Sequence, residues 1–318
     1  MTQEVPSGRR RLRLVLDGRL VRDAPVRPSE GTLWLDAALV AARWGAQLDV
    51  GEDVLGWRDT RSSRTLVFRR GCPRAEAGGH AIALSGRPDW SSGALWLPVD
   101  AVAAAGDARW SVDRRLGVLF LTRTDPYLQP ARILIDPAHG GRESGARLAD
   151  GTPEKELNLA VARRLAALVL ASGAAVALTR SGDQTVSAAT RRRLARQFQA
   201  TVVLSVHHLA SREGPPAAEA YYAPRGDSRR LAAALVAALA GEMGLVGRSV
   251  SPAGVGLLGE LPCPGALTQL GWPEGSEKGH EPGLPWWQLR EALALLSGLR
   301  AYCSQADRDS VAWPSAPM

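Results

Sequence analysis

The sequence predicts an α/β domain with an open, mostly parallel sheet flanked by helices, preceded by a smaller duplicated α+β domain. Three observations lead to this expectation. The chain has 318 residues, of which 45% are hydrophobic, and at roughly 100–200 residues per domain this length suggests two domains. The first half contains an internal repeat. The second half alternates strand-like and helix-like segments, which is typical of an open α/β sheet.

The repeat joins two segments of 20 residues. Residues 31–50, GTLWLDAALVAARWGAQLDV, and residues 93–112, GALWLPVDAVAAAGDARWSV, agree at 9 of 20 positions with an offset of 62. Each copy predicts a short strand, a small Ala-rich helix and a return strand, and another strand follows. Residues 1–122 are therefore expected to form a duplicated module. Since this module has no cluster of His, Cys or paired acids, we expect it to be an adaptor or binding domain.

A change of pattern follows the repeat. Residues 123–131, RTDPYLQPA, are polar, contain two prolines and predict a linker. The α/β domain is expected over residues 132–304, with a C-terminal tail at 305–318. The expected strands are residues 132–136, 174–180, 201–206, 218–223 and 265–270, and the expected helices are residues 152–173, 188–200, 228–242 and 285–303.

The candidate chemistry lies where these strands end. In open α/β sheets, sites form beyond the carboxyl ends of the strands. His139 follows the first strand of the α/β domain, with glycines after it, and His207 directly follows the strand predicted at residues 201–206. Thr152 is expected to cap the next helix and Pro153 to take its first position. Glu154 then falls in the first turn, from where its carboxylate can point into the cleft.

The core face of that helix is already assigned by its apolar residues. They share one stripe at helical spacing: Leu157, Val161, Leu165, Leu168 and Val169.

Two imidazoles and one carboxylate are a standard ligand set for a catalytic zinc, which leaves a fourth position for water. Each residue alone also has an ordinary explanation. A histidine after a strand is commonly a hydrogen-bonded turn residue, and a glutamate at a helix start is commonly an exposed acid.

Composition excludes several classes of function. The net charge is +7, and the only lysines are Lys155 and Lys278. No arginine-rich block with interleaved aromatics is present, so nucleic acid is not an expected partner. The three cysteines are far apart, without the spacing of a zinc ribbon. The longest apolar run, residues 231–240, is too short to span a bilayer, and no transmembrane segment or signal peptide is expected. Either the protein stays inside the cell or its export signal is missing from this chain.

The first half resembles a known family. Residues 9–122 resemble the copper amine oxidase N-terminal-like domain, through GTLWLDAALVAARWG and GALWLPVDAVAAAGD. The resemblance implies a duplicated module that carries no copper chemistry of its own. It also implies a module that is often joined to cell-envelope enzymes.

The second half resembles the zinc-dependent N-acetylmuramoyl-L-alanine amidases. The matching blocks, in family order, are DPAHGGRESGA, EKELNLAVARRL, LTRSGD, AATRRRLA, SVHHLA and PGALTQLGW. The resemblance implies that His139, Glu154 and His207 bind zinc, with Glu156 the nearest competitor for the carboxylate. It places Arg180 and Arg191 near the substrate. It also implies peptidoglycan as the substrate, a location in the cell envelope, periplasm or outside the cell, and a possible envelope protein partner.

One departure from the family concerns catalysis. Gln269 occupies the position of the family's general-base glutamate, and an amide cannot accept a proton at neutral pH. His208 and Glu260 are two candidates to replace that glutamate as the general base.

Three functions remain open: a working zinc amidase with an altered base, a degenerate amidase that binds peptidoglycan or acts as an envelope scaffold, and a hydrolase that acts outside the envelope.

Overall fold

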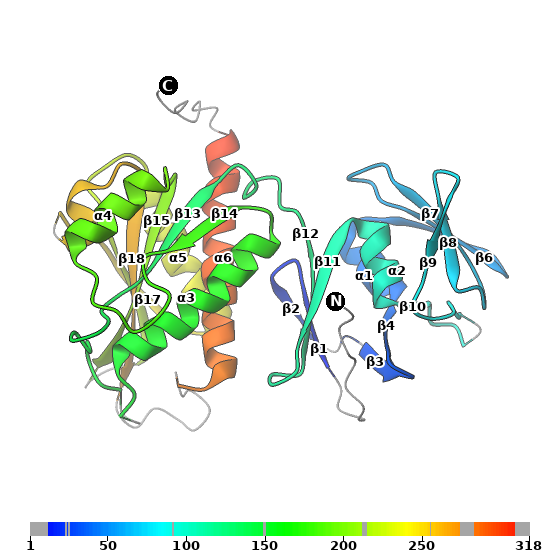
Figure 1. Cartoon of the computed structure of the whole chain (residues 1–318), viewed down its shortest axis with the longest axis horizontal. Coiled ribbons are helices and arrows are strands. Elements are labelled where there is room, and N and C mark those ends of the chain that lie inside the picture. The colour runs from blue at the N-terminus through cyan, green and yellow to red at the C-terminus, as the bar shows by residue number, and fades with distance from the viewer. Residues whose placement is uncertain are drawn as a thin grey trace. The chain divides into compact units, whose positions relative to one another are not determined.

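The computed structural model describes residues 12–22, 24, 26–90, 92–148, 151–211, 215–254, 256–273 and 283–308. The chain divides into two compact units, Met1–Thr124 and Asp125–Met318 (Figure 1).

In its described residues, the first unit contains three small sheets and two short helices. A four-stranded sheet has the order β11-β12-β1-β2, a three-stranded sheet has the order β10-β4-β3, and a five-stranded meander runs from β5 to β9. The strands are β1 (Arg13–Leu16), β2 (Arg19–Val21), β3 (Val26–Ser29), β4 (Thr32–Asp36), β5 (Gln47–Val50), β6 (Val54–Arg58), β7 (Thr65–Arg69), β8 (Arg74–Ala77), β9 (His80–Ala83), β10 (Trp96–Pro98), β11 (Ala108–Asp113) and β12 (Val118–Arg123); the helices are α1 (Ala37–Trp44) and α2 (Val99–Gly106).

The two sequence repeats fold alike and meet each other. Each copy forms a strand, an eight-residue helix and two further strands, as predicted. The first strands of the copies, β4 and β10, pair antiparallel with Leu35 opposite Leu97, which are equivalent positions at the offset of 62. Both helices end on a left-handed residue at another equivalent pair, Gly45 with φ of 66° and Asp107 with φ of 50°. The duplication therefore produces a locally symmetric core.

Within the part of the second unit that the structure describes, one six-stranded sheet has the order β14-β13-β15-β18-β16-β17. All neighbouring strands are parallel except β16 and β18. The strands are β13 (Arg132–Pro137), β14 (Ala175–Leu178), β15 (Val202–Ser211), β16 (Ala217–Tyr222), β17 (Val246–Pro252) and β18 (Gly265–Pro273); the helices are α3 (Glu154–Ala171), α4 (Ala188–Gln197), α5 (Ser228–Met243), α6 (Pro285–Arg308) and the 3₁₀ helix η1 (Gly256–Glu260). The predicted fold class, an open and mostly parallel sheet flanked by helices, is confirmed.

Helices cover the two faces of this sheet unequally. Figure 1 shows α4 on one side of the sheet and α3 and α6 on the other. On the α4 side, a core cluster joins Leu134, Val203 and Leu267 of the sheet to Ala195 of α4 and Leu257 of η1. The apolar stripe predicted for α3 is buried, as expected from its helical spacing.

Several predicted boundaries were wrong. Helix α3 begins at Glu154, so Pro153 is its N-cap and Thr152 precedes the cap. Strand β15 continues to Ser211 because it pairs with β18 from Val203 to Ser211, so His207 lies within a strand. Strand β17 and η1 were not predicted. The helix α6 extends four residues into the expected tail, and residues 309–318 of that tail lie outside the described residues.

The segment predicted as a linker, residues 123–131, is divided between the two units: Arg123 ends β12 in the first unit, and the residues from Asp125 onward belong to the second unit. Leu128 is fully buried. Asp125 accepts a hydrogen bond of 2.6 Å from Nε of Arg300 on α6. The two prolines of this segment therefore lie in a turn that Leu128 and Asp125 attach to the second unit.

Among the described residues, no helix is both long and apolar enough to cross a membrane.

Candidate metal centre

The loop after β13 holds His139 in an unusual backbone conformation. His139, Gly140 and Gly141 all have positive φ angles, of 59°, 128° and 58°. Glycine adopts such angles freely, whereas a residue with a side chain has to be held there by its surroundings. A Cβ on Gly140 would lie 2.3 Å from the carbonyl oxygen of Gln184. The two glycines thus let the loop pass close to its neighbours while His139 turns back over the sheet edge.

Two buried arginines fix this loop. Arg180 donates 2.9 Å hydrogen bonds to the carbonyl oxygens of Pro137 and Ala138. Arg191 donates to the carbonyl oxygens of Pro137 at 3.0 Å and His139 at 2.8 Å, and it forms an ion pair with the buried Asp136. Arg180 and Arg191 are only 3% and 6% exposed. These contacts give both arginines a role in holding the loop and do not support the substrate contact that was expected of them.

Removal of Arg191 is expected to destabilise the second unit. Arg191→Met would leave the carboxylate of Asp136 buried without its cation, although Thr179 and Ser205 would still donate to it. Breaking a buried ion pair from one side costs about 3–5 kcal/mol. Urea unfolding of the metal-free protein measures this loss. Arg193→Met, on an exposed position of the same helix, is the matched control and should change stability by less than about 0.5 kcal/mol; equal effects of the two substitutions would contradict the assignment.

Glu154 is held by several donors at the start of α3. Its Oε2 accepts a 2.9 Å hydrogen bond from the backbone N–H of Ala146, and its Oε1 accepts one of 3.1 Å from the backbone N–H of His208. The amide of Asn158 donates to the same Oε1 at 3.4 Å. The side chain is almost completely buried. Its carboxylate therefore has one fixed orientation.

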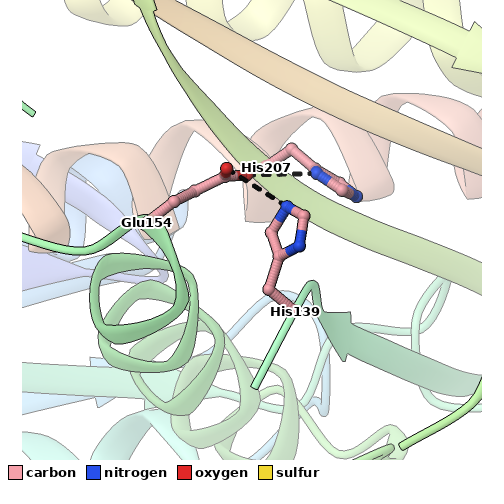
Figure 2. Close-up of side chains that lie close together, drawn as sticks. All are labelled: His139, Glu154 and His207. Carbon is pink, nitrogen blue, oxygen red and sulfur yellow. Dashed lines mark hydrogen bonds and ion pairs between the residues drawn. The ribbon is translucent and has the colours of Figure 1, made fainter. Parts of the chain in front are cut away.

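The three predicted ligands converge on one point. Nε2 of His139 lies 3.1 Å from Oε2 of Glu154, and Nδ1 of His207 lies 3.1 Å from Oε1 of the same carboxylate. One ligand atom from each residue falls within 4.8 Å of the other two. Figure 2 shows both imidazoles directed at the carboxylate, from the loop after β13 and from β15. The imidazole side chains are 27% and 23% exposed, so one side of the cluster is open to solvent.

The electrostatics of the cluster agree with metal binding. Burial alone would raise the pKa of Glu154, but hydrogen bonds from His139, His207 and the Ala146 N–H outweigh it and hold that pKa far below its usual range. The hydrogen bond to Glu154 raises the pKa of His139. The carboxylate is therefore ionised, and in the absence of a metal it attracts protons to the neighbouring imidazole. Two nitrogens, one carboxylate oxygen and an open side suit a catalytic zinc, which takes three protein ligands.

Gly145 leaves the space that these ligands occupy. Its φ is +68°, and a Cβ there would lie 2.4 Å from Oε2 of Glu154 and 2.7 Å from Cδ2 of His139. Gly145→Ala should therefore displace both side chains and weaken zinc binding by about 10–100-fold, the range found when the support of metal ligands is altered. A chelator competition titration measures this affinity. Gly151→Ala has a similar positive φ of +84° with nothing within 4 Å, so it controls for backbone strain; unchanged affinity in Gly145→Ala would contradict the geometry.

Gln269 lies beside the cluster. It is the register partner of His207 on the neighbouring parallel strand β18, so both side chains project from the same face of the sheet. On the other side of β18, Glu219 of β16 is the register partner of Gln269 and shares that face. Both are half-buried. Glu219 was missed in the sequence, although the alternation in AEAYY could have indicated that it lies on the same face as Tyr221.

The two substitutes proposed for the missing base lie elsewhere. His208 neighbours His207 along β15, so its side chain projects from the opposite face and is fully buried there. Glu260 is the last residue of η1, five residues before β18 begins. The start of β18 lies at the edge of the sheet opposite the metal cluster. The carbonyl oxygen of Glu260 accepts a hydrogen bond from Arg196 at the C-terminal end of α4. Neither position supports a role as general base, so both suggestions were wrong.

The chain is similar to known amidases. Residues 133–278 match the model of the N-acetylmuramoyl-L-alanine amidase family. N-acetylmuramoyl-L-alanine amidase LytC of Bacillus subtilis is 36% identical over 174 residues, which are 54% of this chain and 35% of that protein. The chain thus spans about a third of that relative's length.

Solved structures resemble the second unit as well. N-acetylmuramoyl-L-alanine amidase AmiC2 of Nostoc punctiforme is 26% identical with a TM-score of 0.50, over 55% of this chain and 97% of that one. The catalytic domain of the amidase CwlV from Bacillus (Paenibacillus) polymyxa var. colistinus is 25% identical with a TM-score of 0.50, over 55% of this chain and 98% of that one.

Proposed function

We propose that the second unit, which contains the match to the N-acetylmuramoyl-L-alanine amidases, hydrolyses the amide bond between the lactyl group of N-acetylmuramic acid and L-alanine in peptidoglycan. The observation that carries this proposal is the convergence of His139, Glu154 and His207 within a domain that matches this family. Their donor set suits zinc better than calcium or magnesium, which prefer oxygen ligands.

In this proposal zinc, when bound, supplies Lewis-acid polarisation of the scissile carbonyl and a water that is nucleophilic at neutral pH. The chain's own residues supply position. The two carboxylate oxygens of Glu154 contact the two imidazoles, one each, and so orient the rings of His139 and His207. The exposed sides of the two imidazoles leave room for the substrate amide.

Gln269 orients reactants in this scheme without exchanging protons. Its amide N–H groups can donate to the substrate oxygen and its carbonyl oxygen can accept from water. The leaving amine still needs a proton, and general acid–base catalysis contributes typically about 10²–10⁴-fold. Glu219, on the same face and one strand further along the sheet, is our candidate for the carboxylate that handles the proton, through an intervening water.

A second candidate function rests on Gln269 itself. Without a competent base, the domain would bind peptidoglycan and cut it slowly or not at all, as an envelope scaffold or regulator. In both functions peptidoglycan is the ligand and the cell envelope, periplasm or exterior is the site of action. We propose that the first unit is an adaptor or binding domain for the peptidoglycan-directed second unit. The resemblance of the first unit to the copper amine oxidase N-terminal-like domain stays a prediction, as does an envelope protein partner.

The test is to incubate the purified chain with isolated cell wall and to identify the products by mass spectrometry. The amidase predicts free stem peptides that begin with L-alanine and glycans that keep intact lactyl groups. Sedimentation of the protein with the wall, without release of peptides, would favour the binding function. Absence of both would contradict the proposal and favour a hydrolase that acts outside the envelope.

A further inference from the structure

A chain of hydrogen-bonded polar groups lies behind the metal cluster, on the face of the sheet that α3 and α6 cover. His208 is fully buried, and both of its ring nitrogens have partners. Nε2 lies 2.9 Å from Oε2 of Glu291 on α6, and Nδ1 lies 2.7 Å from Oδ1 of Asn158 on α3. The ring therefore connects the last helix of the unit to the helix that begins with Glu154.

The chain ends on the cluster itself. Nδ2 of Asn158 donates to the carbonyl oxygen of Ala138 at 3.2 Å and to Oε1 of Glu154 at 3.4 Å. Ala138 directly precedes His139, so one amide group contacts both the carboxylate and the loop of one imidazole. The backbone N–H of His208 donates to the same Oε1. Every step from Glu291 to Glu154 is thus a contact of 3.4 Å or less.

The direction of the Asn158 amide decides whether this support works. Both groups that face Nδ2, a carbonyl oxygen and a carboxylate, accept hydrogen bonds, so the opposite end of the amide must be the oxygen. That oxygen faces Nδ1 of His208, which consequently donates to it. If the amide turned over, its oxygen would face two acceptors and Glu154 would lose a donor.

We propose that His208 and Glu291 are positioning residues for the metal centre: they fix the Asn158 amide, which in turn holds Glu154 and the backbone before His139. The inference rests on the proposed zinc site. Partners of this kind orient metal ligands, and altering them typically lowers metal affinity by about 10–100-fold. Burying a histidine and a glutamate contributes little to stability compared with apolar side chains of similar volume, which agrees with a role in the site.

The test compares two double variants of the full chain. His208→Leu/Glu291→Leu removes the buried polar pair and the donor to Asn158. His208→Asn/Glu291→Leu removes the same pair but keeps an N–H donor at the position of Nδ1. Ser297→Ala, a half-buried position of α6 away from this chain of contacts, is the control. Zinc affinity is measured by chelator competition, the spectrum of bound Co²⁺ reports ligand geometry, and urea unfolding of the metal-free protein reports stability.

We expect the Leu/Leu variant to bind zinc about 10–100-fold more weakly than the native chain, with an altered Co²⁺ spectrum and no loss of stability. The Asn/Leu variant should recover most of the affinity. Native affinity in the Leu/Leu variant, or equal weakening of both variants, would overturn the inference. Absence of zinc binding by the native chain would instead contradict the proposed metal centre, so the two failures are distinguishable.

Discussion

Replacement of Gln269 by glutamate is expected to accelerate release of stem peptides from cell wall by about 10²–10⁴-fold, the usual contribution of general acid–base catalysis. The reason is geometric. Gln269 and His207 are register partners on adjacent strands, so a carboxylate at position 269 would lie next to the metal cluster on the same face. Initial rates on purified muropeptides, at saturating zinc, measure the gain, which should appear mainly in kcat.

Glu219 provides the complementary arm of this experiment. If Glu219 handles the proton in the native chain, Glu219→Gln should abolish the remaining turnover, while Gln269→Glu/Glu219→Gln should retain the activity of Gln269→Glu. Glu76→Gln, an exposed acid of the first unit, should have no effect. Equal rates for the native chain and Gln269→Glu would show that a base already acts in the site. An inactive Gln269→Glu that still binds zinc would contradict the assigned place of this residue.

Loss of Glu154 is expected to have the second large effect, on metal binding itself. Glu154→Gln removes the ionised oxygens that both imidazoles contact, and a neutral amide is a poor zinc ligand. Zinc affinity should fall by more than about 100-fold, beyond the usual effect of altering a ligand's support, and peptide release should cease. Glu156→Gln, two residues along the same helix and exposed, is the matched control and should bind zinc like the native chain. Similar effects of the two substitutions would contradict the choice of ligand.

The same cluster predicts how zinc binding depends on pH. The pKa of His139 is raised above 6.5 by its hydrogen bond to Glu154, and a protonated imidazole cannot bind a metal. Zinc affinity should therefore be greatest above this raised pKa and fall as the pH decreases through it. Isothermal titration in buffers of different ionisation enthalpy should show proton release on binding, and more of it at lower pH. Affinity that does not change between pH 8 and pH 5.5 would contradict this expectation.

Much of the fold could be predicted from hydrophobic periodicity. The stripe on α3 and the alternation of strands and helices depend on local pattern alone, and the structure has both. The repeat predicted two equivalent supersecondary units, although not that β4 and β10 would pair with each other. Boundaries set by tertiary contacts were missed. The extension of β15 past His207 depends on pairing with β18, a segment about 60 residues away in sequence.

The site shows the same division. The pattern of strands and helices made His139, Glu154 and His207 candidates at one edge of the sheet, and the resemblance to the amidases identified them as one ligand set. The roles of Arg180, Arg191 and His208 depend on which face or carbonyl each side chain meets, and adjacent residues of a strand face opposite ways. His207 contacts Glu154 at the cluster whereas the side chain of His208 contacts Glu291 in the core. No local pattern could reveal the partner on α6, because it lies 83 residues away.

A zinc-soaked crystal of the native chain, examined by anomalous diffraction at the zinc edge, tests the central claim most directly. The account predicts one strong peak within about 2.0–2.2 Å of Nε2 of His139, Nδ1 of His207 and an oxygen of Glu154. A peak bound by other residues, or no peak while the two imidazoles stay hydrogen-bonded to the carboxylate, would contradict it.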